Sequence, residues 1–163
     1  MIQATQDQIV GDGEAFFFGQ STAGDAAFVI NGGAANPSQG GIVAFLNNSD
    51  AGNATFTANG GTVSGGLGAR ISFENISRAV TSSLTATAGS NGGGGGRIQF
   101  TDRSHGGKAR VELLGNGSLD ISEMNTSGVA IGSLEGDGVH CSWIEKFECR
   151  EQRVEHHFRR HHS

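Results

Sequence analysis

The chain has 163 residues, 28 of them glycine, and a formal net charge of −5 at pH 7. This length fits one domain of ordinary size. The negative charge argues against binding to a nucleic-acid backbone, and the apolar runs are too short for a membrane-spanning helix. Such a glycine content is typical of disordered or fibrous chains, but the regular placement of the phenylalanines indicates a folded repeat.

The composition divides the chain near Gly138. Residues 1–138 hold every glycine, whereas residues 139–163 hold both cysteines, the single tryptophan and five of the six histidines. The first part carries 12 acidic and 6 basic residues, a net charge of −6, and the second carries 4 acidic and 5 basic residues, a net charge of +1. We therefore expect a repeat domain over residues 1–138 and a separate tail over residues 139–163.

A repeat of 27–28 residues runs through the first part. Its most regular column is phenylalanine, at Phe17, Phe45, Phe73 and Phe100. An apolar column stands eleven positions later, at Phe28, Phe56, Leu84 and Val111. A serine column stands four positions after the phenylalanines, at Ser21, Ser49, Ser77 and Ser104. The residues two positions after the phenylalanines are of types that tolerate tight turns, namely Gly19, Asn47, Asn75 and Asp102.

Each repeat is predicted to form a short strand, a turn, a second short strand and a glycine-rich return. The strands are runs such as Ile42–Phe45 and Ala54–Ala58, and the second run alternates apolar residues with threonines, as a strand with one buried face does. We expect the serine column to cap the turns. The returns, such as Gly60–Gly68 and Gly89–Gly96, are expected to turn through backbone conformations with positive φ, which glycine adopts readily.

A single unit of this kind cannot bury its apolar face. Units stacked about 4.8 Å apart would place phenylalanine on phenylalanine in parallel register and build a continuous core. The sequence therefore predicts an all-β fold, a right-handed parallel β-helix of about four to five coils. A β-sandwich is the alternative, but it does not explain why the same residue types recur at one offset.

The repeat motifs resemble those of a known class of exported proteins, the bacterial autotransporter passengers and filamentous-haemagglutinin-type surface proteins. The similarity lies in the runs 21–26 (STAGDA) and 50–56 (DAGNATF), and the runs 115–122 (GNGSLDIS) and 131–136 (IGSLEG) resemble the end of such a repeat block. The resemblance covers roughly residues 15–138 and brings no catalytic residues. It implies a secreted β-helical stalk or adhesin segment, extracellular or at the outer-membrane surface.

We therefore expect a non-enzymatic structural or adhesive segment, and we assign no catalytic, cofactor-binding or metal-binding residues. Its expected partners are a host surface, a carbohydrate or the neighbouring repeats of a longer chain, rather than nucleic acid or a directly spanned membrane. Residues Met1–Gly11 lack the basic start and the apolar core of a secretory signal, and no C-terminal membrane barrel is evident. We expect the chain to be a segment of a longer exported protein.

The alternative function is a carbohydrate-active β-helix enzyme, a lyase or a glycoside hydrolase, which would need acids clustered on one face. Asp12 and Glu14 lie two positions apart and would share a strand face. Asp102, Lys108 and Glu112 could approach one another across a turn. No repeated acidic column accompanies these residues, so solvated surface charges are the simpler interpretation.

A third function, ice binding, would need a flat ladder of outward threonines. The two outward columns are Ala27, Thr55, Ser83 and Arg110, and Val29, Thr57, Thr85 and Glu112. Only the middle coils qualify, and the charged fourth coil would interrupt the face.

Two glycine motifs predict no ligand. The run Gly92–Gly96 lacks the Lys-Ser/Thr pair of a phosphate loop and precedes a strand rather than a helix, so we expect a turn. The triplet Gly11–Gly13 contains the Gly-Asp-Gly of a calcium-binding repeat, but the motif does not recur.

The tail is predicted to form a short amphipathic helix over residues 143–160 that caps the solenoid, or else to be a non-native end. Ser142 and Glu145 form a capping box. The apolar residues near one helical stripe are Ile144, Phe147, Val154 and Phe158. Cys141 and Cys149 would lie about 12 Å apart on a helix, beyond disulfide reach. The histidines, expected to be adventitious surface groups rather than a metal site, are His156, His157, His161 and His162.

Overall fold

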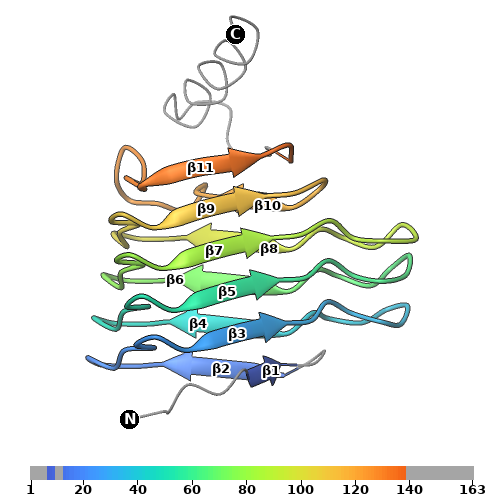
Figure 1. Ribbon diagram of the computed structural model, residues 1–163, viewed down its shortest axis with the longest axis horizontal. Coiled ribbons are helices and arrows are strands. Elements are labelled where there is room, and N and C mark those ends of the chain that lie inside the picture. The colour runs from blue at the N-terminus through green and yellow to red at the C-terminus, as the bar shows by residue number, and fades with distance from the viewer. Residues whose placement is uncertain (1–6, 10–12, 139–163) are drawn as a thin grey trace, which may run out of the picture.

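The computed structural model describes residues 7–9 and 13–138, which form short β-strands and, in that part of the chain, no helix. The strands are β1 (Asp7–Ile9), β2 (Glu14–Phe17), β3 (Ala27–Ile30), β4 (Ile42–Phe45), β5 (Thr55–Ala58), β6 (Arg70–Phe73), β7 (Ser83–Ala86), β8 (Arg97–Phe100), β9 (Arg110–Leu113), β10 (Ser118–Asp120) and β11 (Ser133–Gly136). They build two sheets (Figure 1): an odd-strand sheet in the order β1-β3-β5-β7-β9-β11, and an even-strand sheet in the order β10-β8-β6-β4-β2.

The pairing register follows the sequence repeat. The phenylalanine column pairs in order along the even-strand sheet: Phe17, Phe45, Phe73 and Phe100. The second apolar column pairs in order along the odd-strand sheet: Phe28, Phe56, Leu84 and Val111. Every strand pair is parallel, and the chain is a β-solenoid of about four turns. The predicted all-β parallel β-helix is confirmed, and the antiparallel sandwich is excluded.

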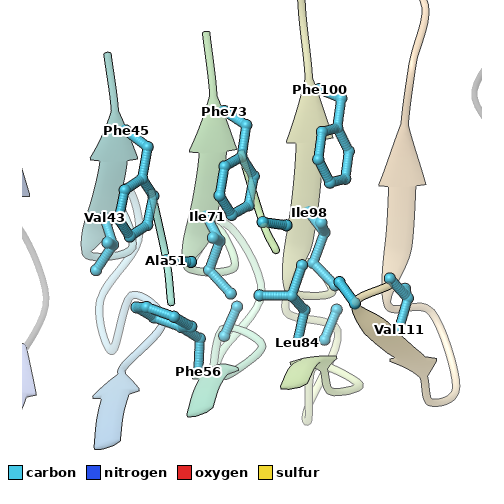
Figure 2. Packing of buried hydrophobic residues seen from close by; sticks show 14 of the residues in the cluster. Val43, Phe45, Ala51, Phe56, Ile71, Phe73, Leu84, Ile98, Phe100 and Val111 are labelled. Atoms are coloured by element: carbon cyan, nitrogen blue, oxygen red, sulfur yellow. The ribbon is translucent and has the colours of Figure 1, made fainter. Parts of the chain in front are cut away.

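The two columns meet inside the solenoid and form its core (Figure 2). The ring of Phe45 stacks on the rings of Phe17 and Phe73, with centroids 4.6 and 4.9 Å away, and meets the ring of Phe56 edge-on at 5.6 Å. Aromatic rings favour both geometries. No member of either column is more than 6% exposed, so both predicted stacks point inward.

The turn after each phenylalanine passes through a residue in the left-handed conformation. The φ values are 63° at Gly19, 58° at Asn47, 58° at Asn75 and 54° at Asp102. The backbone N–H of Asn47 donates to Oδ1 of Asn75 at 2.9 Å, and that of Asn75 donates to Oδ2 of Asp102 at 2.9 Å. The predicted tight turns are therefore confirmed, and their side chains also join one coil to the next.

The predicted capping by the serine column is confirmed in part, because the hydroxyls of Ser49 and Ser104 cap their turns whereas the Oγ of Ser77 is buried without a hydrogen-bond partner. Each serine N–H donates to the carbonyl three residues earlier, at 3.1 Å for Ser21, Ser77 and Ser104 and 3.2 Å for Ser49. The hydroxyls of Ser49 and Ser104 donate to that same carbonyl at 2.8 Å. A short third face then connects the sheets through single parallel bridges that join Thr22, Asp50, Arg78 and His105 in order.

The glycine-rich returns contain glycine for a different reason from the one predicted. Of the glycines within Gly60–Gly68 and Gly89–Gly96, only Gly65 and Gly92 have positive φ, 81° in both cases, and the non-glycine Asn91 has a φ of 49°. Most of the others lie where a side chain would strike the neighbouring backbone. A Cβ on Gly68, for example, would lie 1.9 Å from the carbonyl oxygen of Gly95 in the next coil. Successive returns therefore pack backbone against backbone, which only glycine permits.

Val80 occupies a turn position at which the other coils have glycine. Its φ is 56°, and the φ values of Gly24, Gly52 and Gly107 are 63°, 59° and 64°. A left-handed residue with a Cβ is strained by about 1–2 kcal/mol, so we expect Val80→Gly to be more stable than Val80→Ala by about 1 kcal/mol. At a residue with ordinary negative φ, the alanine variant would instead be more stable than the glycine variant, by about 0.5–1 kcal/mol. Denaturant unfolding of the two variants measures the difference, and an alanine variant as stable as the glycine variant would contradict the strain.

The predictions for the tail, which concern the capping helix, the cysteines and the histidines of residues 139–163, lie outside the described residues. Within the described ranges, none of the chain forms a helix long and apolar enough to cross a membrane.

Candidate binding groove

The glycine-rich returns project sideways from one edge of the solenoid, between the ends of the odd strands and the starts of the even strands (Figure 1). A groove of about 290 Å³ lies where these returns meet the even-strand sheet. One wall consists of the first residues of four even strands: Ile42, Arg70, Arg97 and Ser118. The other wall comes from the returns and from the turn before β10: Gln39, Gly40, Leu67, Gly68, Gly94, Gly95 and Asn116. The groove therefore runs across the coils from β4 to β10.

The strand register aligns the first wall in a column along the solenoid axis. Arg70 pairs with Ile42 on one side and with Arg97 on the other, and Arg97 pairs with Ser118. Successive side chains of a strand point to opposite faces. Because Ile71 is fully buried in the core, Arg70 before it points outward, and the same holds for Arg97.

The two arginines are the unbalanced charges of the groove. Among the described residues, neither side chain has a hydrogen bond or an ion pair, and Nε of Arg70 is buried without a partner. By contrast, Nη2 of Arg78 lies 3.7 Å from Asp50 Oδ2. Like charges on directly paired strand positions repel each other, and an unpaired buried polar atom is costly. The groove therefore has an electrostatic reason to hold an anion.

Three carboxylates lie on the outer face of the even-strand sheet. Glu14 is exposed at the start of β2, two strands from Arg70 in the same column. Glu74, just after β6, accepts a hydrogen bond from Oγ of Ser72 at 3.1 Å. Asp120, 8% exposed, accepts from the N–H and Oγ of Ser122 at 3.0 and 2.7 Å. The strands of Glu74 and Asp120 are separated by β8, which puts the two strand backbones about 10 Å apart at ordinary spacing, and Glu74 lies two residues beyond the register position of Asp120. The carboxyl pairs of glycoside hydrolases lie about 5–9.5 Å apart on the two sides of one bond, whereas these two residues do not share a register position.

The charged residues named from the sequence fall on separate parts of the molecule. Glu14 is exposed at the start of β2, and Asp12 lies outside the described residues. Asp102 is held in its turn by hydrogen bonds from neighbouring asparagines, and Lys108 lies in the turn before β9. Glu112 is on the outer face of the odd-strand sheet. Asp102 and Glu112 thus belong to different hydrogen-bonded groups.

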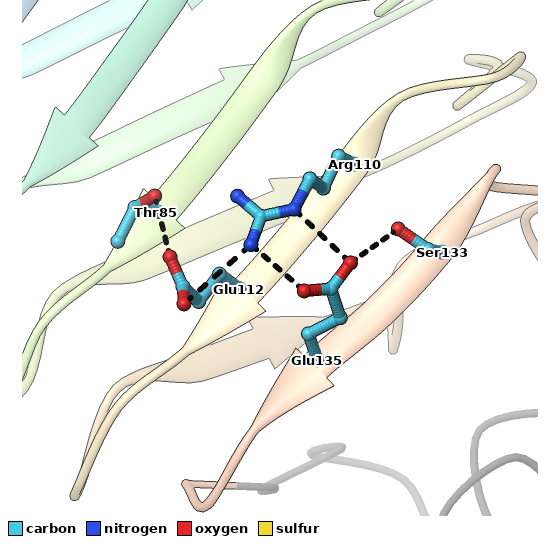
Figure 3. Close-up of polar contacts among 5 residues, drawn as sticks. All are labelled: Thr85, Arg110, Glu112, Ser133 and Glu135. Atoms are coloured by element: carbon cyan, nitrogen blue, oxygen red, sulfur yellow. Dashed lines mark hydrogen bonds and ion pairs between the residues drawn. The ribbon is translucent and has the colours of Figure 1, made fainter. Parts of the chain in front are cut away.

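An ion-pair cluster occupies the outer face of the odd-strand sheet (Figure 3). Nε and Nη2 of Arg110 donate to the two carboxylate oxygens of Glu135 at 3.0 and 2.7 Å, and Nη2 lies 3.7 Å from Glu112. The hydroxyls of Thr85 and Ser133 donate to Glu112 and Glu135 at 3.5 and 3.0 Å. The hydrogen bond with Glu135, and then its charge, raise the pKa of Arg110 above the ordinary value. Arg110 is thus paired with carboxylates, whereas Arg70 and Arg97 of the groove have no ion pair among the described residues.

The same cluster interrupts the face considered for ice binding. Thr55 of β5 is exposed there, and Thr57, Ser83 and Thr85 are half-buried. Their outward orientation is as predicted, but the threonine and serine ladder covers only β5 and β7 before Arg110 replaces it.

Within residues 7–9 and 13–138, no group of three or more His, Cys, Asp or Glu side chains is placed to hold a metal ion. Asp12 of the Gly-Asp-Gly triplet and the five histidines of residues 139–163 lie outside these residues. The run Gly92–Gly96 precedes β8 in a turn, in which the N–H of Gly93 donates to the carbonyl of Ser90 at 2.8 Å. The predicted turn is confirmed.

The sequence did not single out Arg70 and Arg97. A signal was present, because both stand three positions before a repeat phenylalanine, in the column Glu14, Ile42, Arg70 and Arg97. What faces this column depends on the lateral packing of the returns, which the period does not encode. Comparison of the chain with models of protein families, with curated proteins and with solved structures found no match in any of the three.

Proposed function

We propose that this chain is a non-enzymatic structural or adhesive segment of a secreted, surface-displayed repeat protein, whose role is extension and display. The observation that carries the proposal is the in-register stacking of successive coils. Each added repeat lengthens such a solenoid by one strand spacing, about 4.8 Å, and presents the same columns outward. The resemblance to autotransporter passengers supports the same role and a location at the cell surface.

The adhesive part of the proposal rests on the groove. Arg70 and Arg97 carry unpaired positive charge on a chain whose net charge is −5, so they form a local site rather than part of a general basic surface. Backbone-to-backbone packing of the returns fixes the position of the glycines that line the groove beside the arginines. A pre-formed polar groove on a repetitive scaffold suits attachment to a carbohydrate or to a host surface.

A carbohydrate-active enzyme is the alternative, because the two arginines would also suit an acidic substrate. Such an enzyme needs a base or a pair of carboxylates beside the bond that breaks. Of the three carboxylates on this face, Glu74 and Asp120 are each engaged by a neighbouring serine and lie on strands separated by β8. The third, Glu14, lies at the start of β2, two strands from Arg70. This arrangement favours binding over catalysis.

Bacteria that display the chain on an outer-membrane anchor should adhere to carbohydrate-coated surfaces or cultured host cells more than bacteria with the anchor alone. The purified chain should release no products from a panel of polysaccharides, measured as new reducing ends and as unsaturated sugars. Glu74→Gln is the matched variant and should leave both readouts unchanged. Turnover that this substitution abolishes would establish an enzyme instead, and equal adhesion with and without the chain would remove the adhesive role.

A further inference from the structure

We propose that the groove binds a linear polysaccharide that bears carboxylates, a chain of uronic acid residues, along the solenoid axis. Arg70 and Arg97 would each pair with one carboxylate of the polymer. This inference rests on the proposed adhesive function and names the chemistry of its ligand.

The register of the sheet accounts for the linear shape of the ligand. Arg70 and Arg97 are direct partners on neighbouring parallel strands, so their backbones lie about 4.8 Å apart along the axis. This spacing is close to the length of one pyranose unit in an extended polysaccharide. Consecutive coils therefore face consecutive sugars. The column continues to Ile42 and then Glu14 on one side and to Ser118 on the other, so the carboxylate of Glu14 marks one end of the stretch suited to an acidic polymer.

The electrostatics account for the acid. Neither Arg70 nor Arg97 has a hydrogen bond or an ion pair among the described residues, and the Nε of Arg70 is buried without an acceptor. A guanidinium binds a carboxylate through two parallel N–H···O bonds, which a neutral hydroxyl cannot match. Two cations on a chain of net charge −5 are too few for the dense phosphates of a nucleic acid.

The remaining lining accounts for the sugar. Gln39 and Ser118 offer an amide and a hydroxyl that both donate and accept hydrogen bonds, as sugar hydroxyls require. The Asn116 amide is instead held by the returns, because it accepts from the N–H of Gly89 and donates to the carbonyl of Gly93. Leu67, 49% exposed at the groove, provides an apolar contact for the C–H face of a ring.

The test is titration of the full chain with a fluorescently labelled oligoalginate, with a neutral cello-oligosaccharide of equal length and a sulfated dextran oligosaccharide as comparisons. We expect saturable binding of the oligoalginate that weakens as salt rises, and no comparable binding of the neutral sugar. Arg70→Gln and Arg97→Gln should each weaken binding at least about tenfold, because charge-assisted hydrogen bonds are the strongest contacts available. Arg97→Lys should retain part of the affinity, since it keeps the charge and loses the fork.

Arg103→Gln is the matched control, because Arg103 is exposed in the turn after β8, away from the groove, and the net charge changes equally. It should bind like the parent chain. Arg97 is also exposed, so its substitution should leave the thermal unfolding midpoint unchanged and keep the result interpretable. Parent-like binding by Arg97→Gln, equal binding of the neutral sugar, or binding of the sulfated sugar alone would overturn the proposal. If the parent chain mediates adhesion but does not bind oligoalginate, the proposed ligand is wrong and the proposed adhesive function is unaffected.

Discussion

Replacing Phe45 by alanine should lower the free energy of unfolding by about 3–5 kcal/mol, the usual cost of removing a buried aromatic side chain. Phe45 is fully buried, and its ring contacts those of Phe17, Phe73 and Phe56. Those neighbours belong to β2 and β6 of the even-strand sheet and to β5 of the odd-strand sheet. The cavity left by Phe45 therefore cannot close unless these hydrogen-bonded strands shift relative to one another. Equilibrium denaturation monitored by circular dichroism measures the loss.

The matched control is Phe18→Ala, which makes the same chemical change at a residue outside the core. Phe18 directly follows Phe17, the partner of Phe45 on the neighbouring strand. Phe18 is 57% exposed and stacks only on the half-exposed Phe16, with ring centroids 5.9 Å apart. Its replacement should cost less than about 1 kcal/mol, the size of one exposed aromatic contact. Equal losses for the two variants would contradict the central phenylalanine stack.

Gly68→Ala should be among the most damaging single-methyl additions, with an expected loss of about 3 kcal/mol or more, at or above the upper end for overpacking. The added Cβ would lie 1.9 Å from the carbonyl oxygen of Gly95. That atom is backbone of the next coil, so no side-chain rotation can relieve the clash. Gly68 and Gly95 also line the groove, so the returns must separate there. The variant's unfolding free energy, and failing that its yield of folded monomer, measures the effect.

Gly19→Asn is the matched control for glycine replacement. Gly19 has a φ of 63°, but a Cβ there would meet no atom within 4 Å. The next two coils already have Asn47 and Asn75 at this turn position with φ of 58°, and asparagine tolerates the left-handed conformation. We expect a change of less than about 1 kcal/mol, comparable to the cost of the left-handed conformation alone. If Gly68→Ala and Gly19→Asn lower the free energy of unfolding by similar amounts, backbone conformation rather than close backbone approach would explain why Gly68 is glycine.

The sequence alone determined the repeat, the parallel register and the core. A solenoid brings residues one period apart into direct contact, so similarity along the chain becomes contact in space. This is why the phenylalanine, serine and turn columns could each be predicted and are each found in register. The tight turn at Asp102 followed from the same reasoning, because its counterparts are glycine and asparagine.

Only the tertiary structure decided the features that lie off the period or depend on lateral packing. Glu135 binds Arg110 from 25 residues away, and Ser133 pairs with Arg110, because the last described coil is shorter than the repeat. The glycines of the returns are set by how closely neighbouring backbones approach, a distance that no residue pattern states. The groove has the same origin: the sequence supplies the column containing Arg70 and Arg97, but the sideways path of the returns places a wall opposite it.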